Sequence, residues 1–454
     1  MSKLLVINVV GLTPSLVGEH TPNIKRLAQE GELRPMQGTC PAVTTTAQTT
    51  MLTGKAPNDH GIVANGWFFR ELSEAWLWRQ SNRLVQAENV WEEAKRRDPS
   101  FTVANLFWWY NMATTADYSL TPRPLYLADG RKLPGVYGQP LDYRSRIEDA
   151  LPTFPLFNFW GPMAGIESTR WITDASLLTM ESVDPSLTLV YLPHLDYDLQ
   201  RLGPDHPKIA QALQEVDAQA GRLIDAARAT SREIVVVSEY GITPVTDAVH
   251  INRILNQAGF LQTTPVLDTD ELDRWSSRAF AVADHQVAHV YVSDHNDIPS
   301  VKACLESVPG IAQVLERRDY AALGLDHPRS GELFCISEAD RWFSYYFWID
   351  DKRAPDYARC VDIHSKPGYD PVELFLNPEL SFVKARVAGK LLRKKLGFRC
   401  VMDLIPLDTS LVQGSHGRLE AAPETGPLVI SSLPIQNDKT AFGLADVHDL
   451  ILSF

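Results

Sequence analysis

Four short stretches of the sequence concentrate residue types that bind metals or move protons. "VVVSEYG" (235–241) places Glu239 and Tyr240 directly after a run of β-branched residues. The other three are "PHLDYDL" (193–199) with His194, Asp196 and Asp198, "VADHQVAH" (282–289) with Asp284, His285 and His289, and "VDIHSKPGYDP" (361–371) with Asp362, His364, Lys366 and Asp370. Carboxylates and imidazoles ligate divalent metals and act as general acids or bases. The first hypothesis is therefore a metal-binding or hydrolytic site.

The spacing within these stretches supports more than one interpretation. If residues 193–199 are extended, His194, Asp196 and Asp198 share one face, and Asp362 with His364 repeats that spacing. A lone His beside a strand is more often bonded to a backbone carbonyl than to a metal, which applies to His194 and to His289.

The remaining groups also have two interpretations each. His285 and His364 each have an Asp within two residues, so a functional and a structural role both stay open. Asp362 and Asp370 also suit turn caps. Lys366 suits a phosphate contact. Tyr240 either fills space or acts as a general acid or a ligand for a substrate oxygen.

Buried strands that alternate with helices must position these residues. Apolar runs predict strands at 4–10, 187–194, 233–241, 288–293 and 427–432, and helical periodicity predicts helices at 21–31, 207–230 and 250–259. This alternation is typical of a mostly parallel sheet covered on both faces. The carboxyl ends of such strands carry the chemistry of α/β enzymes, and Glu239 and Tyr240 follow one of those ends.

Two stretches depart from the alternation and are predicted to be insertions that cap the site. Residues 67–165 are rich in aromatic side chains and residues 295–405 hold a second group of aromatic and charged motifs. Aromatic density is typical of core packing. The polar residues among these aromatics leave open a second interpretation, a wall that contacts substrate.

Composition excludes several classes of partner and compartment. The 454 residues carry a net charge of -13, which argues against a nucleic acid duplex or an anionic membrane as partner but allows a small phosphorylated substrate. The five cysteines are scattered and form no CxxC pair, so a disulfide framework is not expected. The first apolar run is too short for a signal peptide or a membrane span. We expect a cytoplasmic protein.

Residues 40–68, "CPAVTTTAQTTMLTGKAPNDHGIVANGWF", resemble the alkaline phosphatase superfamily, and within it the type I phosphodiesterases and nucleotide pyrophosphatases. The similar features are a Thr-rich turn, Thr-Gly ten residues later, and then His-Gly-Ile and Asn-Gly. Further similar segments follow the family's order at 21–31, 191–204, 238–241 and 414–432. The resemblance implies a single three-layer α/β/α domain over residues 1–454, with a mostly parallel central sheet and inserted caps.

Members of that superfamily use a Thr or Ser hydroxyl at a helix N-terminus to attack phosphorus between two metal ions about 4 Å apart. Carried over to this sequence, the nucleophile is Thr44, with Thr45 and Thr46 as alternatives in a shifted register. Asp196 and His416 match two ligands of the first metal.

The remaining family positions are substituted, and the substitutions are Gln200 for the third ligand of the first metal, Val10, Glu239 and Tyr240 for the three ligands of the second metal, and Ala47 for a phosphate-binding Asn or Asp. Val does not ligate, and Tyr does so only as a phenolate, whose unperturbed pKa is about 10. Asp196, His416 and the carbonyl of Gln200 suit a harder ion such as Mn or Mg, whereas His and Asp ligands alone suit Zn. We expect one or two divalent metal ions.

Three functions are compatible with these residues. The first is a metal-dependent hydrolase of a phosphodiester, phosphomonoester or related ester through Thr44. The second is a non-catalytic descendant of the same fold that binds a small ligand. The third is a rewired phosphoryl transferase or mutase. The first is favoured because Thr44, Asp196 and His416 occur together, and its expected partner is a small phosphorylated or related anionic substrate. The sequence does not determine the oligomeric state.

Overall fold

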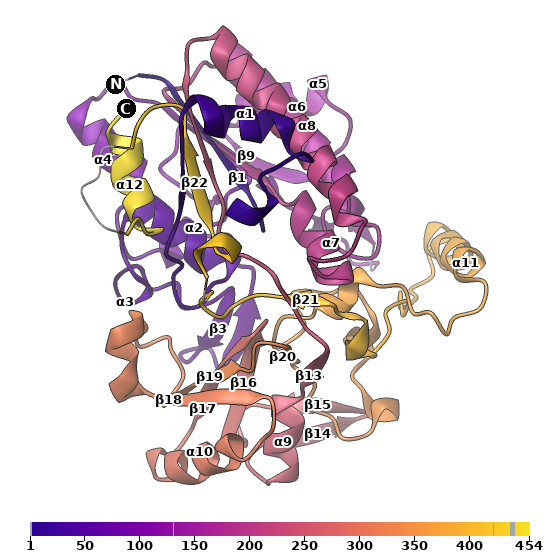
Figure 1. The fold of residues 1–454 in the computed structure, drawn as a ribbon. Helices are drawn as coiled ribbons and strands as arrows, with labels where there is room; N and C mark the ends of the chain where they lie inside the picture. Colours follow the sequence, from indigo (N-terminus) through magenta and orange to yellow (C-terminus); the bar gives the residue numbers. More distant parts are fainter. Residues whose placement is uncertain (1, 130, 421, 436–440) are drawn as a thin grey trace.

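The computed structural model describes residues 2–129, 131–420, 422–435 and 441–454, and a twisted eight-stranded sheet forms its centre (Figure 1). The strand order is β2-β22-β11-β1-β10-β5-β6-β9. The chain of neighbours from β11 through β1, β10 and β5 to β6 is parallel, whereas β22 and β9 pair antiparallel with their neighbours. The bounds are β1 Leu4–Val9, β2 Glu32–Pro35, β5 Val103–Leu106, β6 Tyr118–Pro122, β9 Val136–Gln139, β10 Leu187–Leu192, β11 Glu233–Val237 and β22 Leu428–Ser431.

The central strands form because they are continuous apolar runs that bury both faces. Every residue of β1 and of β10 is buried, which is the pattern of a parallel sheet covered on two sides. The register places Asn8 opposite Tyr191 on one side and Val237 on the other. The strands therefore end together, and the residues that follow β10 and β11 lie at one edge.

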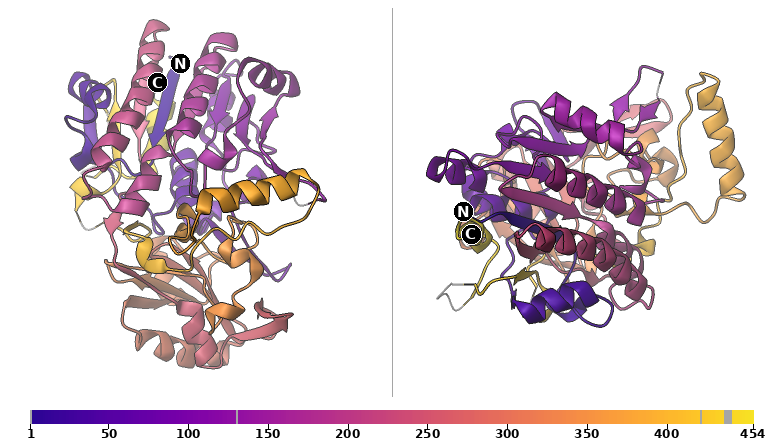
Figure 2. Two further views of the ribbon diagram at one scale, coloured as in Figure 1. Left: turned by 90° about the vertical axis from the view of Figure 1, so that its right-hand side faces the viewer. Right: turned by 90° about the horizontal axis from the view of Figure 1, so that it is seen from above.

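Two groups of helices flank the sheet (Figures 1 and 2). α1, α6, α7 and α8 pack on one another, and α2 packs with α12, which also contacts α4. The bounds are α1 Pro22–Glu30, α2 Thr44–Thr53, α3 Pro57–His60, α4 Val90–Arg97, α5 Leu141–Ala150, α6 Ile166–Ser182, α7 His194–Leu202, α8 Ile209–Ala229, α9 Ile251–Gln257, α10 Ile298–Glu306, α11 Val383–Lys395 and α12 Asp446–Leu452. The predicted three-layer α/β fold with a mostly parallel sheet is confirmed.

A second, antiparallel sheet with the order β16-β17-β19-β18 lies below the central sheet in Figure 1 and has its own apolar core. Its strands are β16 Ala279–Asp284, β17 Val287–Val292, β18 Ile311–Glu316 and β19 Leu333–Ser337. Five two-stranded pairs complete the fold, and they are β3 Gly66–Phe69 with β4 Glu74–Leu77, β7 Leu125–Tyr126 with β8 Lys132–Leu133, β12 Thr243–Pro244 with β21 Gly414–Ser415, β13 Asp247–Val249 with β20 Arg341–Phe343, and β14 Gln262–Val266 with β15 Thr269–Asp273.

The two segments expected as insertions contribute to these sheets as well as to the surface. Residues 67–165 contain β5, β6 and β9 of the central sheet, and residues 295–405 contain β18 and β19 of the second sheet. Their role as caps stays a prediction. Within the described residues, no helix combines the length and the apolar character that crossing a membrane would take.

Candidate active site

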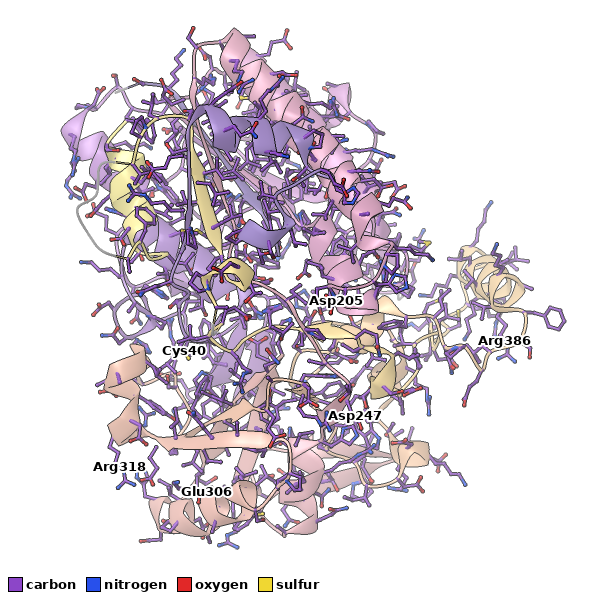
Figure 3. The ribbon with its side chains drawn as sticks, viewed as in Figure 1. Cys40, Asp205, Asp247, Glu306, Arg318 and Arg386 are labelled. Atoms are coloured by element: carbon purple, nitrogen blue, oxygen red, sulfur yellow. The ribbon has the colours of Figure 1, made fainter. Side chains whose placement is uncertain are left out.

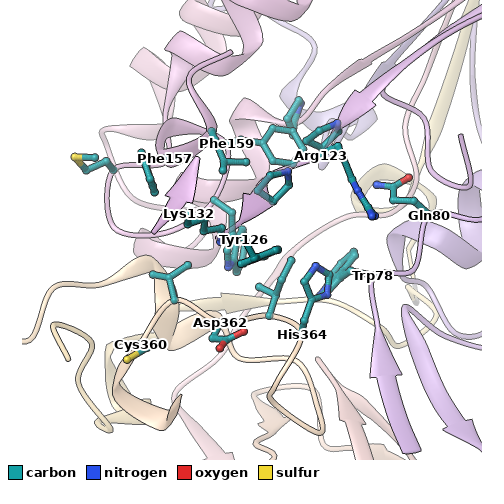
Figure 4. A pocket seen from close by; sticks show the side chains of 18 of the residues that line it. Trp78, Gln80, Arg123, Tyr126, Lys132, Phe157, Phe159, Cys360, Asp362 and His364 are labelled. Atoms are coloured by element: carbon teal, nitrogen blue, oxygen red, sulfur yellow. The ribbon is translucent and has the colours of Figure 1, made fainter. Parts of the chain in front are cut away.

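A cavity of about 1400 Å³ opens between the central sheet, the second sheet and the loop 360–369. We call its deepest part the inner end, which consists of Thr44, Asp196, Tyr240, His285, Tyr369 and His416. The rest of the lining, which we call the outer end, is aromatic and cationic and includes Trp78, Arg79, Arg123, Tyr126, Lys132 and Phe157 (Figure 4). Residues from both predicted insertions therefore line one cavity.

Thr44 is the first residue of α2, after the extended Val43. Its hydroxyl lies 2.9 Å from the hydroxyl of Tyr240. The hydroxyls of Thr45 and Thr46 instead donate to the backbone oxygens of Ala64 and Ile62. Of these three hydroxyls only that of Thr44 belongs to the cavity lining, at a helix N-terminus whose dipole favours an anion.

Four rings lie in a row across the inner end, where the two outer pairs are stacked and the middle pair is tilted by 35°. Tyr240 lies on His416 with centroids 3.6 Å apart and planes 9° apart, His416 lies 3.7 Å from His285, and His285 lies 3.6 Å from Tyr369. Nδ1 of His416 donates to the oxygen of Ala42, at 2.8 Å. Burial lowers the pKa of both imidazoles well below its usual range. Both rings are therefore neutral, and Nε2 of His416 is left as an acceptor.

Asp284 anchors this stack from the end of β16. Its Oδ1 lies 2.7 Å from Nδ1 of His285, and its carboxylate also accepts the backbone N–H and the side-chain amide of Asn65. His285 has a φ of 60° in the turn between β16 and β17, a left-handed conformation that is uncommon for a non-glycine residue. The turn aims the imidazole at His416 and Tyr369.

Glu239 is fully buried at the end of β11, beside the inner end. Its Oε1 accepts hydrogen bonds from the amides of Asn8, at 2.6 Å, and Gln48, at 2.7 Å, while its Oε2 has no hydrogen-bond partner. Burial raises the pKa of the Glu239 carboxyl to about 8. At neutral pH this group is mostly a neutral acid held by two amides.

Asp196 lies on α7 and faces Tyr240. Its Oδ2 accepts from the amide of Gln200, at 2.7 Å, and its Oδ1 has no hydrogen-bond partner. Burial raises the pKa of the Asp196 carboxyl to about 7, and the nearby hydroxyl of Tyr240 opposes that shift. The Gln200 carbonyl is occupied, because it accepts from the hydroxyl of Tyr369 at 2.8 Å.

These contacts do not fit a divalent metal in the described arrangement. The expected ligand oxygen of Gln200 accepts a hydrogen bond from Tyr369, and Oε1 of Glu239 is taken by two amide donors. In the part of the chain that the structure describes, no three His, Cys, Asp or Glu side chains form a group that could hold a metal ion. Each expected ligand set has fewer than three such residues, so Asp196, His416, Gln200 and Glu239 stay predictions as metal ligands.

The extended conformation considered for residues 193–199, which would place His194, Asp196 and Asp198 on one face, is wrong. These residues begin α7, and helical residues two positions apart point in different directions. His194 accordingly bonds to Glu215 of α8, Asp198 pairs with Arg201, and only Asp196 lines the cavity.

The other predicted residues are also separated. His289 bonds to the backbone oxygen of Val63, as the structural alternative predicted. His364 and Asp362 line the outer end (Figure 4), where the ring of His364 lies 6.3 Å from that of Tyr126. The prediction that Lys366 meets a phosphate is wrong, because its ammonium is buried between Asp370 and Glu373 at 2.7 Å from each.

The sequence reasoning missed four residues that shape the inner end, which are Asn8, Gln48, Asn65 and Tyr369. The polar Asn8 inside an apolar strand was the available signal for one of them, since a buried amide needs a partner. Tyr369 carried no such signal. Its neighbours in the stack are distant in sequence.

A profile of the type I phosphodiesterase / nucleotide pyrophosphatase family matches residues 4–370. A curated relative, an uncharacterized pyrophosphatase/phosphodiesterase of Schizosaccharomyces pombe, is 26% identical over 269 residues. The match covers 56% of this chain and 47% of that relative, so it spans about half of the relative's length.

Solved structures share the fold at low sequence identity. Phosphonoacetate hydrolase from Sinorhizobium meliloti 1021, in complex with phosphonoformate, has a TM-score of 0.63 at 13% identity, covering 100% of this chain and 96% of that one. An inactive threonine-to-alanine variant of murine ectonucleotide pyrophosphatase / phosphodiesterase 5, in complex with AMP, has a TM-score of 0.58 at 13% identity, with 100% and 94% coverage.

Proposed function

The chain belongs to the type I phosphodiesterase / nucleotide pyrophosphatase family, and we propose that it hydrolyses a phosphodiester, phosphomonoester or related ester with Thr44 as nucleophile. The observation that carries the proposal is the Thr44 hydroxyl, which lies at the N-terminus of α2 in the cavity, 2.9 Å from a phenol. The inactive threonine-to-alanine form of the murine neighbour supports the need for a threonine in this fold.

The proposed reaction uses groups of this chain. The Thr44 oxygen bonds to phosphorus as the bond from phosphorus to the leaving oxygen breaks, and water later hydrolyses the phospho-threonine. The Thr44 proton passes to the Tyr240 oxygen while the Tyr240 hydroxyl gives its own proton to the nearby carboxylate of Asp196, whose Oδ1 has no hydrogen-bond partner. The pKa of Tyr240 is raised well above its usual value by burial, so it enters as a neutral phenol.

A divalent metal, when bound, would lower the pKa of the nucleophile and stabilise the leaving oxygen. Because the residues present do not assemble its ligand set, the proposed proton route involves no metal. The predicted insertions 67–165 and 295–405 are proposed to form the two walls of the substrate cavity, with Trp78 and Phe157 on one and Asp362 on the other.

Turnover of bis(p-nitrophenyl) phosphate by the full chain tests the proposal, with a chelator and with Zn, Mn or Mg added in turn. We expect turnover that is lost in Thr44→Ala and retained in Thr44→Ser, which keeps the hydroxyl. Equal turnover by Thr44→Ala and the wild type would refute the nucleophile.

Metal content of the same preparations tests the proton route. Undiminished turnover by metal-free protein supports it. A tightly held ion that is required for turnover and is lost in Asp196→Asn would contradict the route and show that the inner end rearranges around a metal.

A specific observation also supports the ligand-binding alternative. Tyr240 and Tyr369 enclose the two imidazoles, an arrangement that suits a packed pocket floor as well as a catalytic one. Thermal stabilisation by AMP without any turnover, with or without added metal, would favour that alternative.

A further inference from the structure

Helix α11 and the residues after it differ from the rest of the molecule in charge. Residues 383–399 contain seven Lys and Arg side chains and no Asp or Glu, in a chain whose net charge is -13. No residue of α11 is buried. The helix stands apart from the two sheets in Figure 1 and in the right-hand view of Figure 2. We call residues 382–399 the basic arm. Its charge is opposite in sign to the net charge of the protein.

Most of these cations have no acidic partner. Lys390 pairs with Asp403. Five others form no ion pair with any carboxylate of the described residues, and they are Lys384, Arg386 (labelled in Figure 3), Arg393, Lys394 and Lys395. The positive charge is therefore available to a partner.

Large apolar side chains are exposed on the same arm. Phe382 is 85% exposed, Leu396 is 66% exposed, Phe398 is 60% exposed and Leu392 is 58% exposed. Leu392 and Leu396 lie one turn apart on the helix. Exposed Leu and Phe interleaved with Lys and Arg are typical of helices that lie in the interface of a membrane.

The arm is continuous with the mouth of the cavity. Leu391, Lys394 and Lys395 line the outer end, and Arg399 donates to the backbone oxygen of Ala128 in the turn between β7 and β8. That hairpin adds Leu125, 55% exposed, and Tyr126, 58% exposed, which also line the cavity. Phe157 and Met163 extend the apolar rim.

We propose that α11 and the β7–β8 hairpin dock on an anionic membrane surface and that the cavity receives an amphiphilic phosphate ester from it. Unpaired cations attract anionic headgroups, and the exposed Leu and Phe side chains enter the boundary between headgroups and acyl chains. The contact is peripheral. The net charge of -13 argued against an anionic membrane as partner. That value sums over the whole chain, whereas α11 and the residues after it are locally positive. The nature of the substrate rests on the proposed hydrolase, but the membrane contact does not.

A nucleic acid or an acidic protein would also attract these cations. Binding to a nucleic acid duplex depends chiefly on contacts between cations and phosphates, and exposed apolar side chains add little to it. The exposed Leu and Phe side chains beside an apolar cavity mouth favour the membrane.

Co-sedimentation of the full chain with vesicles tests the contact. Vesicles of phosphatidylcholine containing one quarter phosphatidylglycerol are compared with pure phosphatidylcholine, and binding to the mixed vesicles is expected to be about tenfold tighter or more. The variant Leu392→Glu/Leu396→Glu should lose binding, and Lys384→Glu/Arg386→Glu should weaken it about thirtyfold or more. Both leave the core intact because α11 has no buried residue.

The matched control is Leu267→Glu. Leu267 is 95% exposed between β14 and β15, among acidic residues, so this variant should bind like the wild type. Thr44→Ala should also bind like the wild type, which separates a failure of the membrane contact from a failure of the hydrolase.

Three outcomes would overturn the contact. They are no binding to the mixed vesicles, equal binding by the α11 variants and the wild type, and binding to a DNA duplex that is tighter than binding to vesicles and unaffected by Leu392→Glu/Leu396→Glu.

Discussion

The two ends of the cavity differ in charge and in origin. The inner end holds neutral imidazoles, phenols with raised pKa, and a carboxyl whose pKa is about 7, all at the edge of buried sheets. The outer end holds Arg79, Arg123 and Lys132, which have no ion-pair partner in the described part of the chain, on hairpins and loops. An anion thus meets positive charge first and a nearly neutral floor afterwards.

The two ends differ in how burial affects the charge of their side chains. At the inner end burial removes charge, since desolvation disfavours ionised carboxyls and imidazolium alike. At the outer end burial also lowers the pKa of Arg79 and of Lys132, but the guanidinium of Arg79 stays charged because its usual pKa is so high. The inner end is suited to position and deprotonate a hydroxyl, and the outer end is suited to recognise a substrate. The following variants separate the two.

Thr44→Ala should have the largest effect. Loss of the proposed nucleophile should lower kcat by about a thousandfold or more, because no covalent intermediate can form. Initial rates with a chromogenic phosphodiester measure it, and circular dichroism verifies the fold. A residual rate within a factor of two of the wild type would remove Thr44 from the chemistry.

Tyr240→Phe should come next. It deletes the hydroxyl that lies 2.9 Å from Thr44 but keeps the ring that stacks on His416. We expect kcat to fall about a hundredfold with little change in KM, as for loss of a proton-transfer group. If Tyr240 only fills space, Tyr240→Phe should match the wild type in both constants.

Glu239→Gln should change stability with pH. The folded pKa of about 8 lies above the unfolded value near 4.5, so the carboxyl costs no stability below about pH 4.5 and costs progressively more as pH rises through 8. The neutral, similarly shaped Gln avoids that cost. Urea unfolding should show the variant about 2 kcal/mol or more stable at pH 9, and near the wild type at pH 4.5. A difference that is independent of pH would contradict the assignment.

Arg79→Gln should have the smallest effect. It alters only the outer end and should therefore change KM and leave kcat unchanged. Arg79 lines the cavity with a buried Nε that has no hydrogen-bond partner. For an anionic substrate we expect KM to rise about tenfold with kcat unchanged, since uniform binding is lost. The control is Arg131→Gln, which lines the same cavity but pairs with Asp129 and should change KM less. Equal KM values for the two variants would remove Arg79 from recognition.

Local patterns in the sequence were enough to predict most of the central layer. Continuous apolar runs predicted β1, β10, β11 and β22, and helical periodicity predicted α1 and α8 within two residues at each end. These signals are local, because burial on both faces of a strand or on one face of a helix leaves a pattern in consecutive residues. The order of the motifs likewise predicted the family.

The error at 193–199 shows how two periods compete in a short segment. His194, Asp196 and Asp198 alternate as in a strand. Leu195, Leu199 and Leu202 instead recur at helical spacing. These leucines pack in the core, and that packing stabilises α7. Seven residues are too few to separate the two periods from sequence alone.

What the sequence determined by itself was the fold class, the family and the hydroxyl at the start of α2. Only the tertiary structure decided that Tyr240, His416, His285 and Tyr369 stack, that Lys366 is buried in an ion cluster and that α11 stands free beside the cavity mouth. The physical reason is that strand and helix patterns arise from neighbours along the chain. Ring stacking, desolvation and exposure arise instead from residues that are far apart in sequence and meet only in the folded protein.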